Sequence, residues 1–184
     1  MTGPLSDPSD PDFYALVATA RTVLGAGIGD DPDTWEAAVG PDHLDVPGDG
    51  LLRRDHGLVE ISFAPAPGGR MACFGFGVKI HRLIHDRTRR TVPSPLSRRY
   101  GPFAPRIRFD ELRARVTGLG HTVETDDGTG DIHRYRVAES GARIFVIADP
   151  DPYARGDHEP PGPQDHQAGD VWSIDVSPAW WDPR

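Results

Sequence analysis

The feature that most constrains the fold is a pair of segments in which apolar residues alternate with small or polar ones. LVEISF (58–63) places valine, isoleucine and phenylalanine at every second position, and FGFGVKI (74–80) repeats the spacing with four more apolar residues. Because successive strand side chains point to opposite faces, each segment predicts a strand with one apolar face. APAPGG (64–69) predicts the connecting loop of a β-hairpin. Glycines at alternate positions of the second strand predict a flat opposite face that a helix or a partner backbone could approach.

Two short helices are predicted ahead of this hairpin. Apolar residues at helical spacing follow Ser9 and Pro11, which are typical of a helix start, so we expect a helix over residues 12–24 that ends at Gly25. A second helix is expected to begin at Asp33, with Glu36 completing a pair that resembles a capping box, and to end at Gly40.

The remainder of the chain repeats this order of elements. The segment 86–108 is rich in proline and arginine and predicts an extended linker. A helix is expected to start at Asp110 and Glu111. Strands are then expected at about 121–125, 132–138 and 142–148, and in VWSIDVS (171–177). We therefore predict an α+β fold of two similar halves, 1–85 and 109–184, each a helix followed by antiparallel strands, whose strands could share one sheet.

Composition limits the location and the chemistry. No apolar run approaches the length of a transmembrane helix, about 18 residues, and residues 1–12 lack the basic start and apolar centre of a secretory signal. Cys73 is the single cysteine, so the chain cannot form an internal disulfide or a cysteine-based zinc site. We expect a cytoplasmic protein without a membrane segment. The 19 arginines against a single lysine are typical of a GC-rich bacterial genome.

Charge is segregated along the chain. Residues 1–52 carry 1 basic and 10 acidic residues, residues 53–108 carry 12 and 3, and residues 109–184 carry 7 and 15, for a net charge of −8. Such blocks neutralise one another in a fold or steer a charged partner. The arginines of residues 86–108 could contact phosphate, with Tyr100 and Phe103 to stack bases. The sparse aromatic residues and the acidic remainder argue against nucleic-acid binding.

The sequence RRDHG (53–57) raises the question of an active site. Gly57 lies where the apolar pattern changes register, and glycine adopts the backbone angles that a bend or bulge needs. We therefore interpret Asp55 and His56 as structural residues. A catalytic role would require Asp55 to orient His56, but adjacent strand residues point to opposite faces, and no serine or cysteine nucleophile motif accompanies them.

Three other motifs partly resemble cofactor or metal sites. His81 and His85 lack a third ligand and a helix, and the acidic DDGTGD (126–131) lacks the ligand spacing of a calcium loop. GAGIG (25–29) follows a helix rather than a strand, unlike a dinucleotide fingerprint. We therefore predict no metal and no cofactor.

Two resemblances suggest a function. LLRRDHGLVEISF (51–63) followed by FGFGVKIHRL (74–83) resembles the paired-strand signature of small cytosolic proteins, among them immunity proteins, found beside polymorphic toxins of high-GC bacteria. The element order is similar to the tandem helix-plus-sheet β-lactamase inhibitory proteins and, in each half, to small outer-membrane assembly lipoproteins. The missing disulfides and signal peptide depart from that group. The first resemblance implies a protein that neutralises a cognate toxin by covering its surface, without catalysis.

The candidate partner-binding residues are an acidic run beside a tryptophan: Asp30, Asp31, Asp33, Trp35 and Glu36. Acidic charge next to an aromatic anchor is the composition of an interface, and it predicts a toxin with a basic surface. In the other interpretation, which stays open, Asp33 and Glu36 only cap a helix and Trp35 fills the core. The alternative function is a small cytosolic enzyme whose site residues are scattered along the chain, namely Asp55, His56, Glu60, His81 and His85.

Overall fold

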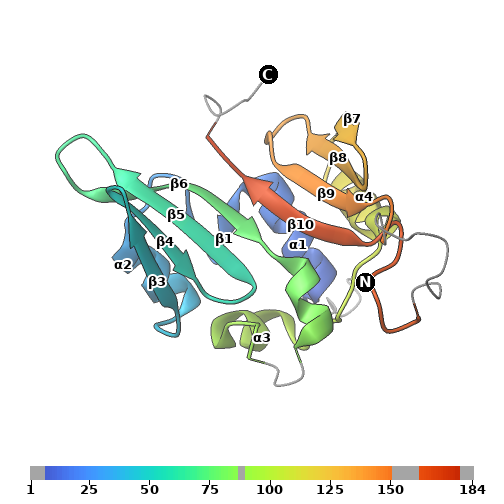
Figure 1. Ribbon diagram of the computed structural model, residues 1–184, viewed down its shortest axis with the longest axis horizontal. Coiled ribbons are helices and arrows are strands. Elements are labelled where there is room, and N and C mark those ends of the chain that lie inside the picture. Colours follow the sequence, from blue (N-terminus) through green and yellow to red (C-terminus); the bar gives the residue numbers. More distant parts are fainter. Residues whose placement is uncertain (1–6, 87–89, 151–161, 179–184) are drawn as a thin grey trace, which may run out of the picture.

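The computed structural model describes residues 7–86, 90–150 and 162–178, and its centre is one antiparallel sheet (Figure 1). Within these residues the strand order is β3-β4-β5-β6-β10-β9-β8-β7. The strands of the first half are β3 (Leu44–Gly48), β4 (Leu51–Asp55), β5 (Val59–Pro65) and β6 (Met71–Val78). Those of the second half are β7 (Val123–Thr129), β8 (Ile132–Val137), β9 (Arg143–Ile147) and β10 (Val171–Val176).

The last strand joins the two halves of the chain. β3 to β6 form one meander and β7 to β9 form another, and β10 pairs with both β6 and β9. Ile174 of β10 lies opposite Val78 on one side and Ile144 on the other. The predicted α+β class with antiparallel strands is confirmed, and the strands of both halves belong to one sheet. The similarity of the two halves stays a prediction.

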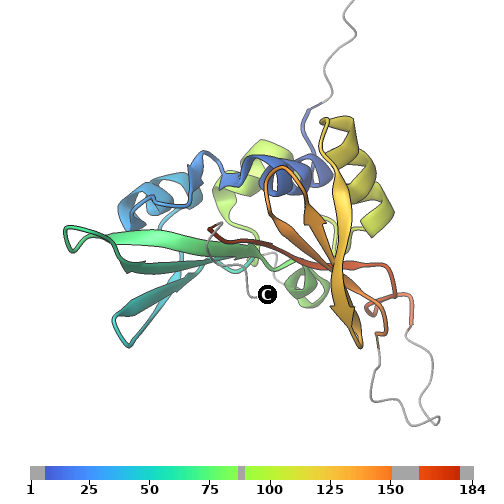
Figure 2. The ribbon, with the colours of Figure 1, turned by 90° about the horizontal axis from the view of Figure 1, so that it is seen from above.

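Helices cover one face of this sheet, and the core lies between the two layers. Figure 2 shows α1 (Asp10–Ala20), α2 (Pro32–Val39) and α4 (Phe109–Gly118) on the same side of the strands. The 3₁₀ helix η1 (Ile80–His85) lies on the other side. Most strand side chains that face the helices are apolar, as the alternation predicts, and the completely buried ones include Val59, Ile61, Phe63, Ile144 and Ile174. No helix in the described part of the chain is long and apolar enough to cross a membrane.

The predicted linker contains a helix. Residues 94–100 form α3 (Ser94–Tyr100), in which Leu96 is completely buried and Tyr100 is 8% exposed. The two side chains are four residues apart, so they lie on one face of the helix, which packs against α1 and α2. The expectation of an extended linker over 86–108 is therefore wrong for this stretch, because two apolar anchors suffice to dock a short helix onto the core.

The first helix ends earlier than the glycine signal predicted. α1 ends at Ala20, and Arg21 takes the left-handed conformation with a φ of 60°. The two following strands, β1 (Thr22–Val23) and β2 (Ala26–Gly27), form a small hairpin. The guanidinium of Arg21 donates a hydrogen bond to the carbonyl of Ser177 at 2.7 Å, a contact that exists only in the folded chain.

Candidate functional site

Two of the predicted acidic residues have structural partners. Asp31, not Asp33, is the N-cap of α2, because its side chain accepts a hydrogen bond from the Thr34 amide at 2.8 Å. This bond lowers the pKa of Asp31, and an ion pair with Arg70 at 2.6 Å lowers it further. The Asp30 carboxylate accepts a hydrogen bond from the Gly27 amide at 2.8 Å and so stabilises the turn before the helix. The predicted capping role of Asp33 is therefore wrong.

Trp35 is a core residue. It is completely buried, its ring meets Phe76 edge-on with centroids 5.0 Å apart, and its Nε1 donates to the Gly27 carbonyl at 3.2 Å. A partner cannot reach it in this structure. Asp33 and Glu36 are the members of the acidic run whose carboxylates face solvent, with the side chain of Glu36 44% exposed.

An apolar surface that the sequence did not predict lies on the β3–β4 hairpin, on the face that points away from α2. β3 and β4 are joined by a two-residue turn at Asp49 and Gly50, whose φ angles of 50° and 76° fit the type I′ turn that an Asp-Gly pair favours. Leu44, Val46 and Leu51 on this hairpin are 66%, 40% and 47% exposed. The register places Gly48 opposite Leu51, so the three side chains lie on one face. These three residues are called the apolar patch below.

Arg54 fixes the hairpin to α2. Its guanidinium makes two hydrogen bonds to the Asp45 carboxylate, at 2.8 and 3.0 Å, and one to the Pro32 carbonyl at 3.0 Å. The hydrogen bonds from Arg54 also lower the pKa of Asp45. Arg54 is only 7% exposed. The acidic helix and the apolar patch are therefore held at the same end of the molecule, where Figure 1 shows α2 beside β3 and β4. This region, residues 32–55, is called the hairpin end.

The free edge of β3 is poorly suited to pairing with another strand. Pro47 lies within β3 and has no amide hydrogen to donate. Proline and charged residues on edge strands oppose the addition of a further strand. A partner at the hairpin end is therefore expected to contact side chains rather than to extend the sheet.

RRDHG forms the turn between β4 and β5, as the bend interpretation predicted. Asp55 pairs with Glu60 across the two strands, and Gly57 between them has a φ of 83°. A Cβ on Gly57 would lie 2.4 Å from the Thr91 carbonyl oxygen, so only glycine fits this close approach. Arg82 of η1 binds both carboxylates, at 2.8 Å from Asp55 and 2.9 Å from Glu60. These acids therefore form an ion-pair cluster.

The three candidate histidines do not form one site, although His81 and His85 both lie on η1. His56 is 5% exposed and packs against His43, with ring centroids 5.0 Å apart. Burial lowers the pKa of His56 to about 4, so its imidazole is neutral at neutral pH. His81 instead stacks on Trp172 of β10 at 4.0 Å, and His85 lies 6.0 Å from His166. In the described ranges, no three histidine, cysteine or acidic residues are grouped to hold a metal ion.

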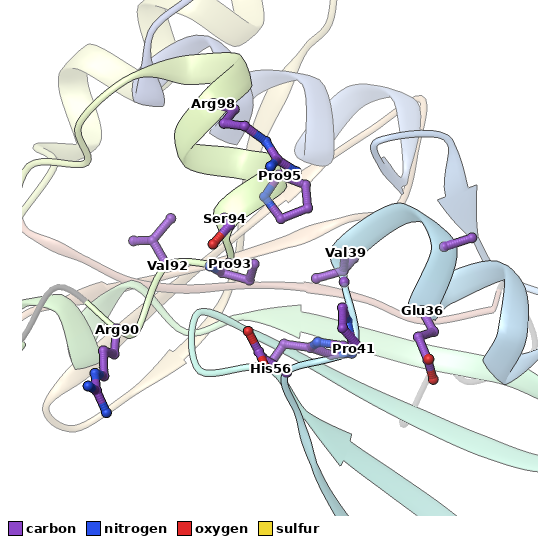
Figure 3. Close-up of a pocket in the computed structure, with 13 residues that line it drawn as sticks. Glu36, Val39, Pro41, His56, Arg90, Val92, Pro93, Ser94, Pro95 and Arg98 are labelled. Carbon is purple, nitrogen blue, oxygen red and sulfur yellow. The ribbon is translucent and has the colours of Figure 1, made fainter.

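A pocket of about 760 Å³ lies between α2 and the segment 90–98 (Figure 3). His56 and Val39 contribute to one wall, and Val92 contributes to the other. The sequence does not predict this pocket, because residues 90–98, which form its second wall, are expected to be part of an extended linker.

The comparisons with known proteins add no relative. No protein-family model, no curated protein and no solved structure matches this chain.

Proposed function

We propose that the protein binds a protein partner at the hairpin end and, as its resemblance to immunity proteins implies, neutralises a bacterial toxin by covering its surface without catalysis. The observation that carries this proposal is the apolar patch. Clustered exposed aliphatic side chains on a soluble domain mark interaction sites. Leu44, Val46 and Leu51 are 40–66% exposed on a hairpin that Arg54 holds in place. Burying the exposed part of each side chain in an interface would contribute roughly 1 kcal/mol.

The hairpin end as a whole is acidic, which favours a basic partner, although the register places Arg53 opposite Val46 on the face of the patch. Asp33 and Glu36 of α2, together with Asp49 at the hairpin turn, place acidic groups at the hairpin end of a chain whose net charge is −8. An apolar centre with a charged rim is the usual composition of a protein interface. Acidic groups at the rim raise the association rate with a basic surface more than they raise affinity.

The enzyme alternative has weaker support. Its two carboxylates, Asp55 and Glu60, are held by Arg82. His56 packs against His43, whereas His81 and His85 lie on η1. A general base needs to lie within hydrogen-bonding reach of the proton it removes, with a partner that orients it. These residues do not form such an arrangement.

The test uses the product of the neighbouring gene as the candidate toxin, and measures growth rescue and affinity with purified chains. The double variant Leu44→Thr and Val46→Thr removes apolar surface without changing charge or strand propensity. It should weaken binding by about tenfold or more and reduce rescue. Leu119→Thr is the matched control, because Leu119 is 51% exposed just beyond the end of α4, outside the hairpin end, and should bind normally. Failure of the wild-type chain to bind, or equal losses in both variants, would refute the proposal.

A second measurement tests the acidic rim. Asp30 and Asp31 are unsuitable targets because both brace α2, so the variants are Asp33→Asn with Glu36→Gln. This double variant should associate more slowly than the wild-type chain at about 0.01 M salt, where the screening length is about 30 Å. At about 0.15 M salt, where the screening length is about 8 Å, the two association rates should be similar. Asp110→Asn with Glu111→Gln removes the same charge from the first turn of α4 and serves as the control. A rate that does not depend on salt would eliminate steering by this rim.

A further inference from the structure

The pocket beside the hairpin end has the size of a small-molecule site. Its volume of about 760 Å³ falls within the range of ligand pockets, about 300–1,000 Å³. Val39 and Pro41 line one side, and Val92, Pro93 and Pro95 line the other (Figure 3). Valine and proline side chains present rigid apolar walls, which suit the body of an organic molecule.

Two arginines at this pocket are free to bind a ligand. Arg90 and Arg98 both line it and are exposed, and within the described residues neither guanidinium forms an ion pair or a hydrogen bond. Arginine presents several donors in a fixed fork that matches carboxylate, sulfonate and phosphate groups. Two unpaired arginines at the rim of an apolar pocket therefore favour an anion.

The lining also contains two acidic residues, so its formal charges cancel. Glu36 lies 3.6 Å from Arg54, which also pairs with Asp45, and Asp42 is the second acid. The preference for an anion therefore rests on the two exposed guanidiniums and not on the net charge of the lining.

His56 lies in one wall of the pocket. Its ring is buried and both ring nitrogens are inaccessible in this structure, with the backbone of Asp42 close to the ring. His56 therefore shapes the wall and is not one of the groups that bind the anion.

We propose that this pocket binds a small organic anion, with its apolar body against the valine and proline walls and its charged group at the rim that carries Arg90 and Arg98. The inference does not rest on the apolar patch, because Leu44, Val46 and Leu51 are not among the lining residues, while Glu36 belongs to both the lining and the acidic rim.

The probe is anilinonaphthalene sulfonate, which combines an aromatic body with one anionic group and fluoresces when it leaves water. The wild-type chain should bind it saturably. Arg98→Gln should weaken binding by about tenfold, the effect of losing one charge-assisted hydrogen bond. Arg99→Gln is the matched control: it removes the same charge from the adjacent residue of α3, outside the lining, and should change the dissociation constant by less than about twofold.

Two further measurements locate the probe and define its chemistry. Val92→Trp narrows the pocket without changing its charge and should weaken binding, whereas Leu44→Thr with Val46→Thr should leave it intact. Benzoate and phenyl phosphate should displace the probe at lower concentrations than neutral benzyl alcohol, and their order distinguishes a carboxylate site from a phosphate site. NMR signals of Val39, Val92 and His56 should move during the titration.

Several results would overturn the proposal. They are no saturable binding at millimolar probe, equal losses in Arg98→Gln and Arg99→Gln, displacement by benzyl alcohol as readily as by the anions, or loss of binding only when the apolar patch is changed. None of these results bears on the toxin-binding experiment, which measures growth rescue and affinity for the toxin rather than binding of the probe.

Discussion

The two ends of the sheet differ in the kind of side chain that they expose. At the end formed by β7 and β8, charged side chains pair with one another: Glu124 with Arg136 at 3.3 Å, and Asp126 with Arg143 at 3.4 Å. At the hairpin end, every residue of β3 is exposed, and the side chains on view include the aliphatic Leu44 and Val46. Both ends have a free edge, so the edge position alone does not account for the apolar exposure.

The attachment of each end explains what this difference means. The hairpin end is held by buried groups, Trp35 and Arg54, whereas several of the charged pairs at the other end lie on the surface. A loosely packed segment would expose apolar groups because nothing holds it in place. This hairpin exposes them while being firmly attached, which is the property of a preformed binding surface.

The largest expected effect is a loss of stability when the attachment of the hairpin end is removed. Trp35→Ala should lower the free energy of unfolding by about 3–5 kcal/mol, because it leaves a large cavity against Phe76 and removes the bond to Gly27. Chemical denaturation measures the loss. Leu119→Ala should cost less than about 0.5 kcal/mol, since that side chain is exposed. A loss below about 1 kcal/mol in Trp35→Ala would show that the tryptophan does not anchor α2.

The second effect depends on pH. The folded state keeps His56 neutral with a pKa of about 4, whereas an unfolded imidazole has a pKa of about 6.5. Below about pH 6.5 the unfolded state therefore binds the proton first, and stability falls as the pH drops to about 4. The contribution of His56 to this fall is roughly 3 kcal/mol.

His56→Phe isolates that contribution, because the partly buried His81 and His166 also have lowered pKa values and act in the same direction. Denaturation of both proteins between about pH 7 and 4 should show a shallower decline in the variant. Parallel curves would mean that His56 takes up its proton in the folded state as readily as in the unfolded state.

A pair of arginine substitutions compares the two ends directly. Arg54→Met removes three hydrogen bonds from a site that is 7% exposed and should cost about 2 kcal/mol. Arg136→Met removes an ion pair whose side chains are 44% and 50% exposed, and should cost at most about 0.5 kcal/mol. Thermal unfolding of both variants measures the difference. Equal losses would contradict the contrast between buried and surface attachment.

The smallest effect concerns the start of α2. Asp31→Ala should cost about 1 kcal/mol because it removes the N-cap bond to Thr34. Asp33→Ala should cost only a few tenths of a kcal/mol, the value of a charge in the first turn of a helix. A fall in melting temperature of about 2–4 °C for the first variant and little change for the second would agree with this assignment. The reverse order would restore Asp33 as the cap.

The cap of α2 and the elements β3 and α3 were not predicted correctly because their local sequence signals were ambiguous or weak. Asp31, Pro32 and Asp33 offer two possible caps, and the proline at the first helical position is the signal that selects Asp31. β3 gave no alternating pattern because LDVPG is exposed throughout, and alternation appears only where one face is buried. α3 is only seven residues long, and its apolar anchors lie among arginines and prolines.

By itself, the sequence determined the β5–β6 hairpin, the turn at Gly57 and the strands of the second half, because their periodicity and turn residues act over a few neighbours. It also located the acidic residues of α2. Only the tertiary structure decided that Trp35 is buried, that Leu44 and Val46 are exposed, and that Arg98 and His56 line one pocket. Burial and the shape of a pocket depend on which distant segments pack together, and no local pattern of residues records that choice.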